Sequence, residues 1–178
     1  MNINVYDDFF SEEIHENIWN LMQRPKWSYT GGRQGSRFWH MENLEQEEYF
    51  NTFLFNTICK KLNKKFEVER IYANGQTGGQ SGNPHADSCY NGDFTFLYYP
   101  NPYWDLSWGG HLMFIDKETT EDHTSYKTNP ENEILKIVTY KPNRALLFPG
   151  KIFHYAEAPF KYFNDLRVSL AYKLTTLE

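Results

Sequence analysis

The feature that most constrains the fold is a series of short β-prone segments that begins after Lys65. Each segment is rich in β-branched and aromatic residues, and Gly, Pro or Asn separates it from the next. Short strands at this spacing are typical of an antiparallel sandwich or barrel, and the aromatic content of 18% also favours strands. The predicted strands are Val68–Ala73, Phe94–Tyr99, His111–Ile115, Ile134–Tyr140, Ala145–Phe148, Phe153–Ala158 and Arg167–Leu174.

Two helical patterns precede the predicted strands. Ser11, followed by two glutamates, has the composition of a helix N-cap with an acidic first turn. A second pattern runs from about Gln46 to Lys64, where apolar residues recur at helical spacing. The glycine-rich segment Trp27–Met41 between them is interpreted as a strand or loop with glycine hinges. We therefore predict a mainly β fold, with a jelly-roll core at about residues 66–175 supported by two N-terminal helices at about residues 1–65.

Length and charge exclude several classes of protein. A chain of 178 residues is typical of one domain that buries a core without disulfides. The net charge is -5 and the longest basic runs are lysine pairs, so no nucleic-acid or membrane partner is expected. Neither a signal peptide nor an apolar run of the ~20 residues that span a bilayer is evident. Cys59 and Cys89 match no zinc-ligand or redox spacing. These features predict a soluble, cytoplasmic protein with reduced cysteines, and they leave its oligomeric state open.

A candidate metal-binding pattern lies in the middle of the chain. His85 and Asp87 are two positions apart, and residues at this spacing point to the same side of an extended chain, so both can bind one ion. His154, at the start of a late predicted strand, offers a third ligand. Two imidazoles and one carboxylate form the facial set associated with non-haem Fe(II) oxygenases. A His-x-Asp pair also arises by chance, so the pair alone leaves open a hydrogen-bonded surface turn.

Five groups of residues around this pattern follow one another in a characteristic order. They are Tyr72-Ala73-Asn74-Gly75-Gln76 before His85; Thr95-Phe96-Leu97-Tyr98-Tyr99-Pro100-Asn101; Trp104-Asp105 with Gly109-Gly110-His111-Leu112; Asn143-Arg144-Ala145-Leu146-Leu147-Phe148-Pro149 before His154; and Arg167-Val168-Ser169-Leu170. In this order they resemble the prolyl 4-hydroxylase-like branch of the 2-oxoglutarate and Fe(II)-dependent dioxygenases. The resemblance covers nearly all of residues 68–174, and the opening Val5–Ser11 resembles the usual lead-in of that family.

The resemblance implies both a fold and an activity. The fold is a cupin-like double-stranded β-helix, and the metal is Fe(II) bound by His85, Asp87 and His154. The activity is the hydroxylation of an organic substrate by O2, coupled to oxidative decarboxylation of 2-oxoglutarate to succinate and CO2. The substrate is a small molecule or a peptide, and the resemblance makes a peptidyl proline the first candidate.

The resemblance also implies how 2-oxoglutarate is bound. Arg167 matches the basic residue that pairs with the distal carboxylate, and a planar guanidinium can donate two parallel hydrogen bonds to that group. Tyr99 matches a tyrosine that donates a further hydrogen bond to the same carboxylate. Tyr72 matches a tyrosine that lines the cosubstrate pocket. Without the order of the motifs, Tyr99 would be interpreted as a core aromatic residue.

One interval departs from the family pattern. Arg167 follows His154 after 13 positions, which is longer than is usual in the family, and residues 159–165 are expected to form an extended hairpin. The longer interval leaves Lys161 and Lys173 as alternative anchors for 2-oxoglutarate. Arg167 is preferred because it begins an alternating strand pattern that would point its side chain inward.

Two other functions remain open at this stage. The first is a cupin-like metal-dependent enzyme that does not use 2-oxoglutarate. The second is a metal-free jelly-roll module that binds carbohydrate by stacking aromatic side chains on sugar rings. Tryptophans at the mouth of the core would either grip a substrate or pack in the ordinary way; the candidates are Trp27, Trp39, Trp104 and Trp108.

Overall fold

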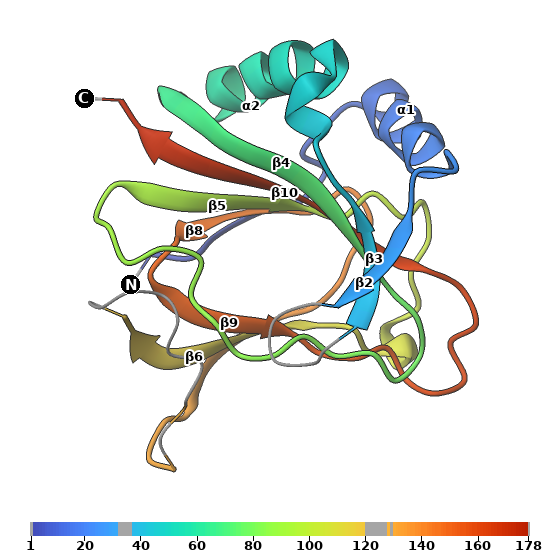
Figure 1. The fold of residues 1–178 in the computed structure, drawn as a ribbon, viewed down its shortest axis with the longest axis vertical. Coiled ribbons are helices and arrows are strands. Elements are labelled where there is room, and N and C mark those ends of the chain that lie inside the picture. The colour runs from blue at the N-terminus through green and yellow to red at the C-terminus, as the bar shows by residue number, and fades with distance from the viewer. Residues whose placement is uncertain (1, 32–36, 120–127, 129, 178) are drawn as a thin grey trace.

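The structure is a computed structural model that describes residues 2–31, 37–119, 128 and 130–177. Its strands form a seven-stranded sheet in the order β1-β8-β5-β10-β4-β3-β2 and a three-stranded sheet in the order β7-β6-β9. Figure 1 shows the small sheet facing one side of the large sheet and the helices covering its other side. The strands are β1 Asn4–Tyr6, β2 Ser28–Gly31, β3 Arg37–Met41, β4 Phe66–Gln76, β5 Asp93–Tyr98, β6 Leu112–Glu118, β7 Ile134–Val138, β8 Ala145–Pro149, β9 Ile152–Ala156 and β10 Arg167–Thr176. This arrangement confirms the predicted mainly β, jelly-roll class.

Strand β10 is the central element of the large sheet, because it pairs antiparallel with both β4 and β5. Successive side chains of a strand point to opposite faces. One set of alternate residues on β10 packs in the core beneath the helices, namely Val168, Leu170, Tyr172 and Leu174. The other set faces the small sheet and lines a pocket, namely Arg167, Ser169, Ala171 and Lys173. The alternation in the sequence therefore divides β10 into a structural face and a functional face.

The first predicted helix is confirmed as α1, Glu12–Met22. The Ser11 side chain accepts a hydrogen bond from the Ile14 N–H, as expected of an N-cap. Ile18 and Met22 are buried against the large sheet. The Trp27 indole N–H donates to the Met22 carbonyl at 2.8 Å, so this tryptophan satisfies an otherwise unpaired group at the helix end.

The second predicted helix is divided into three parts. A 3-10 turn at Leu44–Gln46 and a π-helical segment at Tyr49–Leu54 precede α2, Phe55–Leu62. The Phe50 carbonyl lies in the π-helical segment and accepts a hydrogen bond from the buried Tyr172 hydroxyl at 3.0 Å. A tertiary partner of this kind favours a local departure from α geometry that periodicity does not predict.

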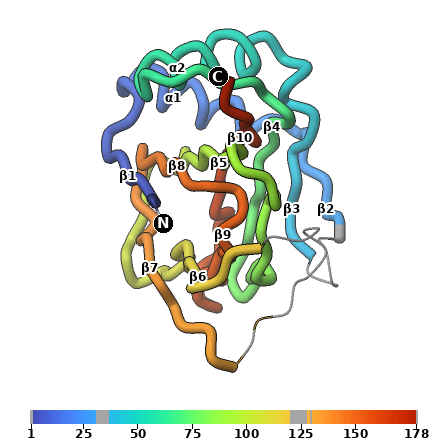
Figure 2. The backbone as a smooth tube through the Cα atoms, turned by 90° about the vertical axis from the view of Figure 1, so that its left-hand side faces the viewer, coloured from blue at the N-terminus to red at the C-terminus, as the bar shows by residue number. Residues whose placement is uncertain are grey.

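Two features at the edges of the large sheet refine the prediction. The segment Trp27–Met41 contains β2 and β3, which pair with each other, and β3 pairs with β4. Its glycines at 32 and 35 lie outside the described residues. At the opposite edge, the lead-in contributes the short strand β1 beside β8 (Figure 2).

Most of the predicted loop 118–132 lies outside the described residues. No helix in the described part of the chain is long and apolar enough to cross a membrane.

Candidate metal centre

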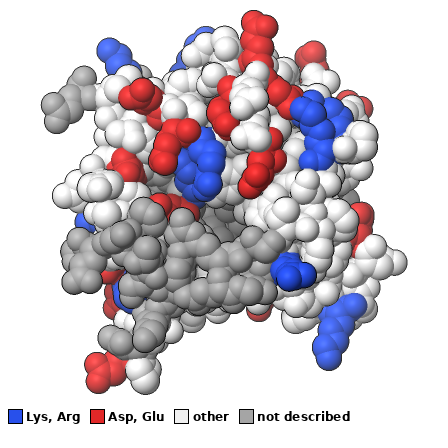
Figure 3. Space-filling view, viewed as in Figure 1, with Lys and Arg blue, Asp and Glu red and all other residues white. Residues whose placement is uncertain are grey.

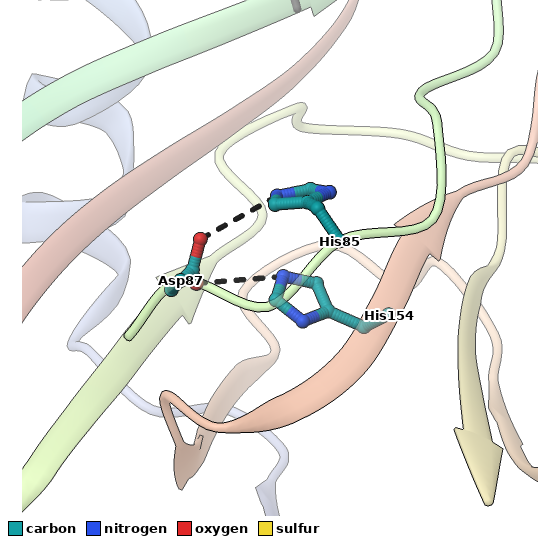
Figure 4. A group of neighbouring side chains, drawn as sticks. All are labelled: His85, Asp87 and His154. Atoms are coloured by element: carbon teal, nitrogen blue, oxygen red, sulfur yellow. Dashed lines mark ion pairs between the residues drawn. The ribbon is translucent and has the colours of Figure 1, made fainter. Parts of the chain in front are cut away.

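The three predicted metal ligands lie together because a short extended segment runs beside β9. His85 and His154 form an isolated antiparallel bridge, in which each backbone N–H donates to the carbonyl of the other residue. The Asp87 N–H donates to the Gly150 carbonyl at 2.8 Å, which fixes the far end of the segment. Figure 4 shows the two imidazoles and the carboxylate converging on one point. The predicted common direction of His85 and Asp87 is thus present.

The ligand atoms are close enough to share one ion. One ligand atom from each of the three residues lies within 4.8 Å of the others. His85 Nε2 is 3.4 Å from Asp87 Oδ1, and His154 Nε2 is 3.4 Å from Asp87 Oδ2. Both imidazoles donate their Nδ1–H to a backbone carbonyl, of Asn83 and Ile152 respectively. These bonds fix the tautomer that leaves each Nε2 lone pair available to a metal.

The electrostatics of the site also favour a cation. The Asp87 side chain is only 7% exposed, which disfavours its ionised form, but the Lys173 ammonium and the two imidazoles outweigh this effect and hold the pKa of Asp87 well below its usual range. Burial lowers the pKa of His154 to about 4. At neutral pH the site therefore contains a carboxylate and a neutral His154 imidazole, which are the forms that bind metal.

The donor set fits Fe(II). Two imidazole nitrogens and one carboxylate oxygen on one side of an ion form the facial set of non-haem iron enzymes. Within the described residues, these three side chains are the group of His, Cys, Asp and Glu residues with this geometry. The other described histidines lie outside the group, namely His15, His40 and His111. His123 falls outside the described residues.

A pocket extends from the metal ligands toward Arg167. His85, His154 and Arg167 all line this pocket. Lys173, which pairs with Asp87, and Arg167 lie at opposite ends of the pocket-lining face of β10, so the guanidinium lies away from the metal ligands. Arg167 is completely buried. Its Nε donates to the Gly110 carbonyl at 2.7 Å and its Nη1 donates to Gln76 Oε1 at 2.8 Å, while its Nη2 has no hydrogen-bond partner in the described structure. Buried donors of a charged group are rarely left unpaired, so this nitrogen indicates a place for an anionic ligand.

Tyr99 lies beside Arg167 as an aromatic neighbour. The guanidinium carbon is 5.5 Å from the centre of the Tyr99 ring, which stacks on Tyr140 at 4.1 Å. Tyr99 is fully buried in the second core cluster, and its hydroxyl has no hydrogen-bond partner in the described structure. Burial raises the pKa of Tyr99, so the hydroxyl keeps its proton and can donate. Tyr99 is not among the residues that line the pocket, so its predicted hydrogen bond to 2-oxoglutarate stays a prediction.

The other residues proposed for the cosubstrate are separated by the structure. Tyr72 lines the pocket. Lys173 also lines it, but its ammonium forms an ion pair with Asp87 at the metal end and lies 5.6 Å from the Tyr72 ring. Lys161 is exposed on the loop that joins β9 to β10. Of the three basic candidates, Arg167 is the one whose buried guanidinium keeps an unpaired donor in the described structure.

The long interval between His154 and Arg167 folds away from the pocket. The Phe160 N–H donates to the Trp108 carbonyl at 2.9 Å, and the buried Phe163 ring lies 4.9 Å from the Trp104 ring and 5.2 Å from the Trp108 ring. The extra residues therefore lie in the loop that joins β9 to β10 and not within the strand that carries Arg167. Trp104 and Trp108 pack against this loop and do not line the pocket.

Two positioning features of Arg167 were not predicted from the sequence. Asn101 accepts a hydrogen bond from the Val168 N–H and donates one to the Leu166 carbonyl, so it holds the backbone on both sides of Arg167. Gly110 has φ +71°, and a Cβ atom there would lie 2.9 Å from Arg167 Cδ. The glycine pair in the sequence is the one signal that could have revealed this close approach.

Replacing Gly110 with alanine is expected to lower the free energy of unfolding by about 1–3 kcal/mol, because the new methyl group overlaps the Arg167 side chain. Urea denaturation measures the change. Gly79→Ala is the matched control, because Gly79 also has a positive φ of +82° but has no atom within 4 Å of its Cβ position. Equal losses in the two variants would show that backbone strain, and not contact with Arg167, makes Gly110 necessary.

The fold and the donor set together define a mononuclear non-haem metal enzyme built on a double-stranded β-helix. The sequence profile described as the 2OG-Fe(II) oxygenase superfamily matches residues 69–171. The chain therefore belongs to this superfamily, whose cofactors are Fe(II) and 2-oxoglutarate. This assignment favours an oxygenase over the 2-oxoglutarate-independent cupin and over the carbohydrate-binding module. No curated protein sequence matches the chain significantly.

Solved structures share the fold at low sequence identity. A prolyl hydroxylase from Trichoplax adhaerens, in complex with a peptide fragment of hypoxia inducible factor, is 17% identical with a TM-score of 0.64; the match covers 98% of this chain and 83% of that one. A Pseudomonas putida prolyl-4-hydroxylase is 14% identical with a TM-score of 0.60, covering 99% and 93%. HygX from Streptomyces hygroscopicus, with nickel and 2-oxoglutarate bound, is 11% identical with a TM-score of 0.70, covering 98% and 82%.

Proposed function

We propose that this oxygenase hydroxylates an organic substrate, with a peptidyl proline as the first candidate. The observation that carries the proposal is a single pocket lined both by the metal ligands His85 and His154 and by Arg167, whose Nη2 is unpaired in the described structure. A dicarboxylate that binds the metal through its oxo-acid end would meet the guanidinium at its distal end. The order of motifs, which resembles the prolyl 4-hydroxylase-like branch, supports proline as the substrate.

Each residue of the pocket has a defined part in this proposal. His85, Asp87 and His154 would hold Fe(II). When bound, the metal would supply the site at which O2 is activated, coupled to the oxidative decarboxylation of 2-oxoglutarate. Arg167 pairs with the distal carboxylate of the cosubstrate, and Tyr99 donates a further hydrogen bond to it. Tyr72 lines the cosubstrate pocket. Apolar side chains exclude water from the pocket, and they include Leu97, Leu112 and Phe148.

The substrate class is tested by a succinate assay. The protein is reconstituted without oxygen with Fe(II) and 2-oxoglutarate, and O2 is then added with proline-containing peptides, with free amino acids or with small-molecule extracts. We expect succinate above the uncoupled background with the peptides, and a mass increase of one oxygen on proline. Stimulation by small molecules alone would contradict the proline proposal and leave the oxygenase assignment intact. HygX, which has been solved with hygromycin B bound, is a neighbour of this fold with a small-molecule ligand.

The surface and the cysteines support the remaining proposals on partners and location. On the face shown in Figure 3, the described Lys, Arg, Asp and Glu side chains are intermixed and form no continuous basic surface. This distribution supports the prediction that nucleic acid is not a partner. Cys59 and Cys89 are both free, which supports the prediction of a cytoplasmic location.

A further inference from the structure

Lys173 places a buried cation directly against a metal ligand. Its side chain points from β10 into the pocket, and the residue is only 8% exposed. The ammonium forms an ion pair with Asp87 Oδ2 and donates to Thr95 Oγ1 at 3.1 Å. The Thr95 hydroxyl in turn donates to the same Asp87 oxygen at 2.5 Å. The carboxylate that would hold the metal is therefore already neutralised by a side chain of the protein.

The charges in the pocket change sharply as its ligands arrive. Asp87, Lys173 and Arg167 together carry one excess positive charge. A divalent ion raises the excess to three, and the dianion of 2-oxoglutarate returns it to one. Like charges held a few ångströms apart repel strongly in a buried site. The lysine should therefore oppose binding of the metal at Asp87, and once the metal has taken that carboxylate the ammonium becomes available to pair with a dianion.

We propose that Lys173 couples metal binding to 2-oxoglutarate binding. The ammonium competes with the divalent ion for the Asp87 carboxylate, and it then attracts the anionic cosubstrate once the ion is bound. Because coupling between two ligands is reciprocal, 2-oxoglutarate tightens metal binding by the same factor by which metal tightens 2-oxoglutarate binding. The inference rests on the proposed 2-oxoglutarate site and adds a residue that links it to the metal.

A second effect of Lys173 has the opposite sign. The lysine also orients the Asp87 side chain, and loss of a residue that orients a metal ligand typically weakens metal binding by about 10- to 100-fold. Thr95 continues to orient the same carboxylate oxygen when the lysine is replaced. The ammonium, in contrast, is the cation that contacts Asp87 in the described structure. The charge effect should therefore dominate the orientation effect.

Lys173→Gln tests the proposal because glutamine can donate a hydrogen bond to Asp87 but carries no charge. Calorimetric titration with Mn(II), which accepts the same ligands, measures metal affinity with and without 2-oxoglutarate. We expect Lys173→Gln to bind Mn(II) alone about 10-fold more tightly than the native chain, as removal of a nearby like charge predicts. The factor by which 2-oxoglutarate tightens Mn(II) binding should fall to a similar extent. Lys173→Arg should restore native behaviour, and Lys65→Gln, at an exposed lysine, should not alter it.

Three results separate this inference from the proposed function. Unchanged or weaker Mn(II) binding by Lys173→Gln, with native coupling to 2-oxoglutarate, would overturn the role of the lysine. A native chain whose Mn(II) affinity does not respond to 2-oxoglutarate would instead contradict the proposed function. If Lys173→Gln unfolds without metal, Mn(II) should restore its fold and raise its Tm more than that of the native chain, and an equal rise would overturn the inference.

Discussion

Replacing His154 with alanine is expected to abolish 2-oxoglutarate turnover and to weaken divalent metal binding by more than about 100-fold, because the change removes a ligand and not merely a residue that orients one. The buried Nε2 of His154 faces Asp87, and the group of possible metal ligands found among the described residues contains only His85 and Asp87 besides it. Calorimetric titration with Mn(II) measures the affinity, and succinate formation measures turnover.

His111→Ala is the control for this prediction. His111 is a partly buried histidine on the same chain segment as the Gly-Gly pair, but it lies outside the metal group. The variant should retain native metal affinity. Retention of metal binding by His154→Ala, or its loss in His111→Ala, would show that the ligand set has been wrongly assigned.

Replacing Arg167 with methionine is expected to weaken 2-oxoglutarate binding by at least about 100-fold. The reason is that the distal carboxylate of 2-oxoglutarate would lose its charge-assisted hydrogen bonds to the guanidinium. Binding of Mn(II) alone should persist, since Arg167 begins β10 whereas Lys173, further along the strand, is the residue that contacts Asp87. Titration of the Mn(II)-loaded protein with 2-oxoglutarate measures the effect. The variant also loses contacts to Gly110 and Gln76, so its fold is checked by circular dichroism.

Two further substitutions make the Arg167 prediction specific. Arg167→Lys keeps the charge but not the two parallel donors, so it should recover only part of the affinity. Lys161→Met removes the exposed alternative anchor and should leave 2-oxoglutarate binding unchanged. Native 2-oxoglutarate affinity in Arg167→Met, or a large loss in Lys161→Met, would contradict the assignment of Arg167 as the anchor.

The strands of the core could be predicted because their evidence is local. Alternation along Arg167–Leu174, for example, indicates which side chains of β10 point inward, and the structure places Arg167 and Lys173 on one face as that pattern requires. The edges of the sheet were less predictable, because β1 and the β2–β3 pair depend on partners distant in sequence. The π-helical segment likewise depends on Tyr172. That the whole chain forms one domain stays a prediction.

The metal ligands could also be predicted from the sequence, but one contact to them could not. His85 and Asp87 are recognisable because two positions in extended chain share one direction, and His154 is recognisable from the order of the motifs around it. The contact between Lys173 and Asp87 has no such local signal, because it forms only when β10 lies beside β5 and the ligand segment lies beside β9. The sequence left Lys173 open as an alternative anchor for 2-oxoglutarate, whereas in the structure its ammonium contacts the metal ligand Asp87.

The central claim is that one pocket binds Fe(II) and 2-oxoglutarate together through His85, Asp87 and His154. The most direct measurement is an anaerobic titration of the native chain with both ligands, followed by visible absorption. We predict a charge-transfer band that requires Fe(II) and 2-oxoglutarate together, saturates at equimolar Fe(II), and is absent from His154→Ala. The lack of such a band in the native chain, or its persistence in His154→Ala, would contradict the claim.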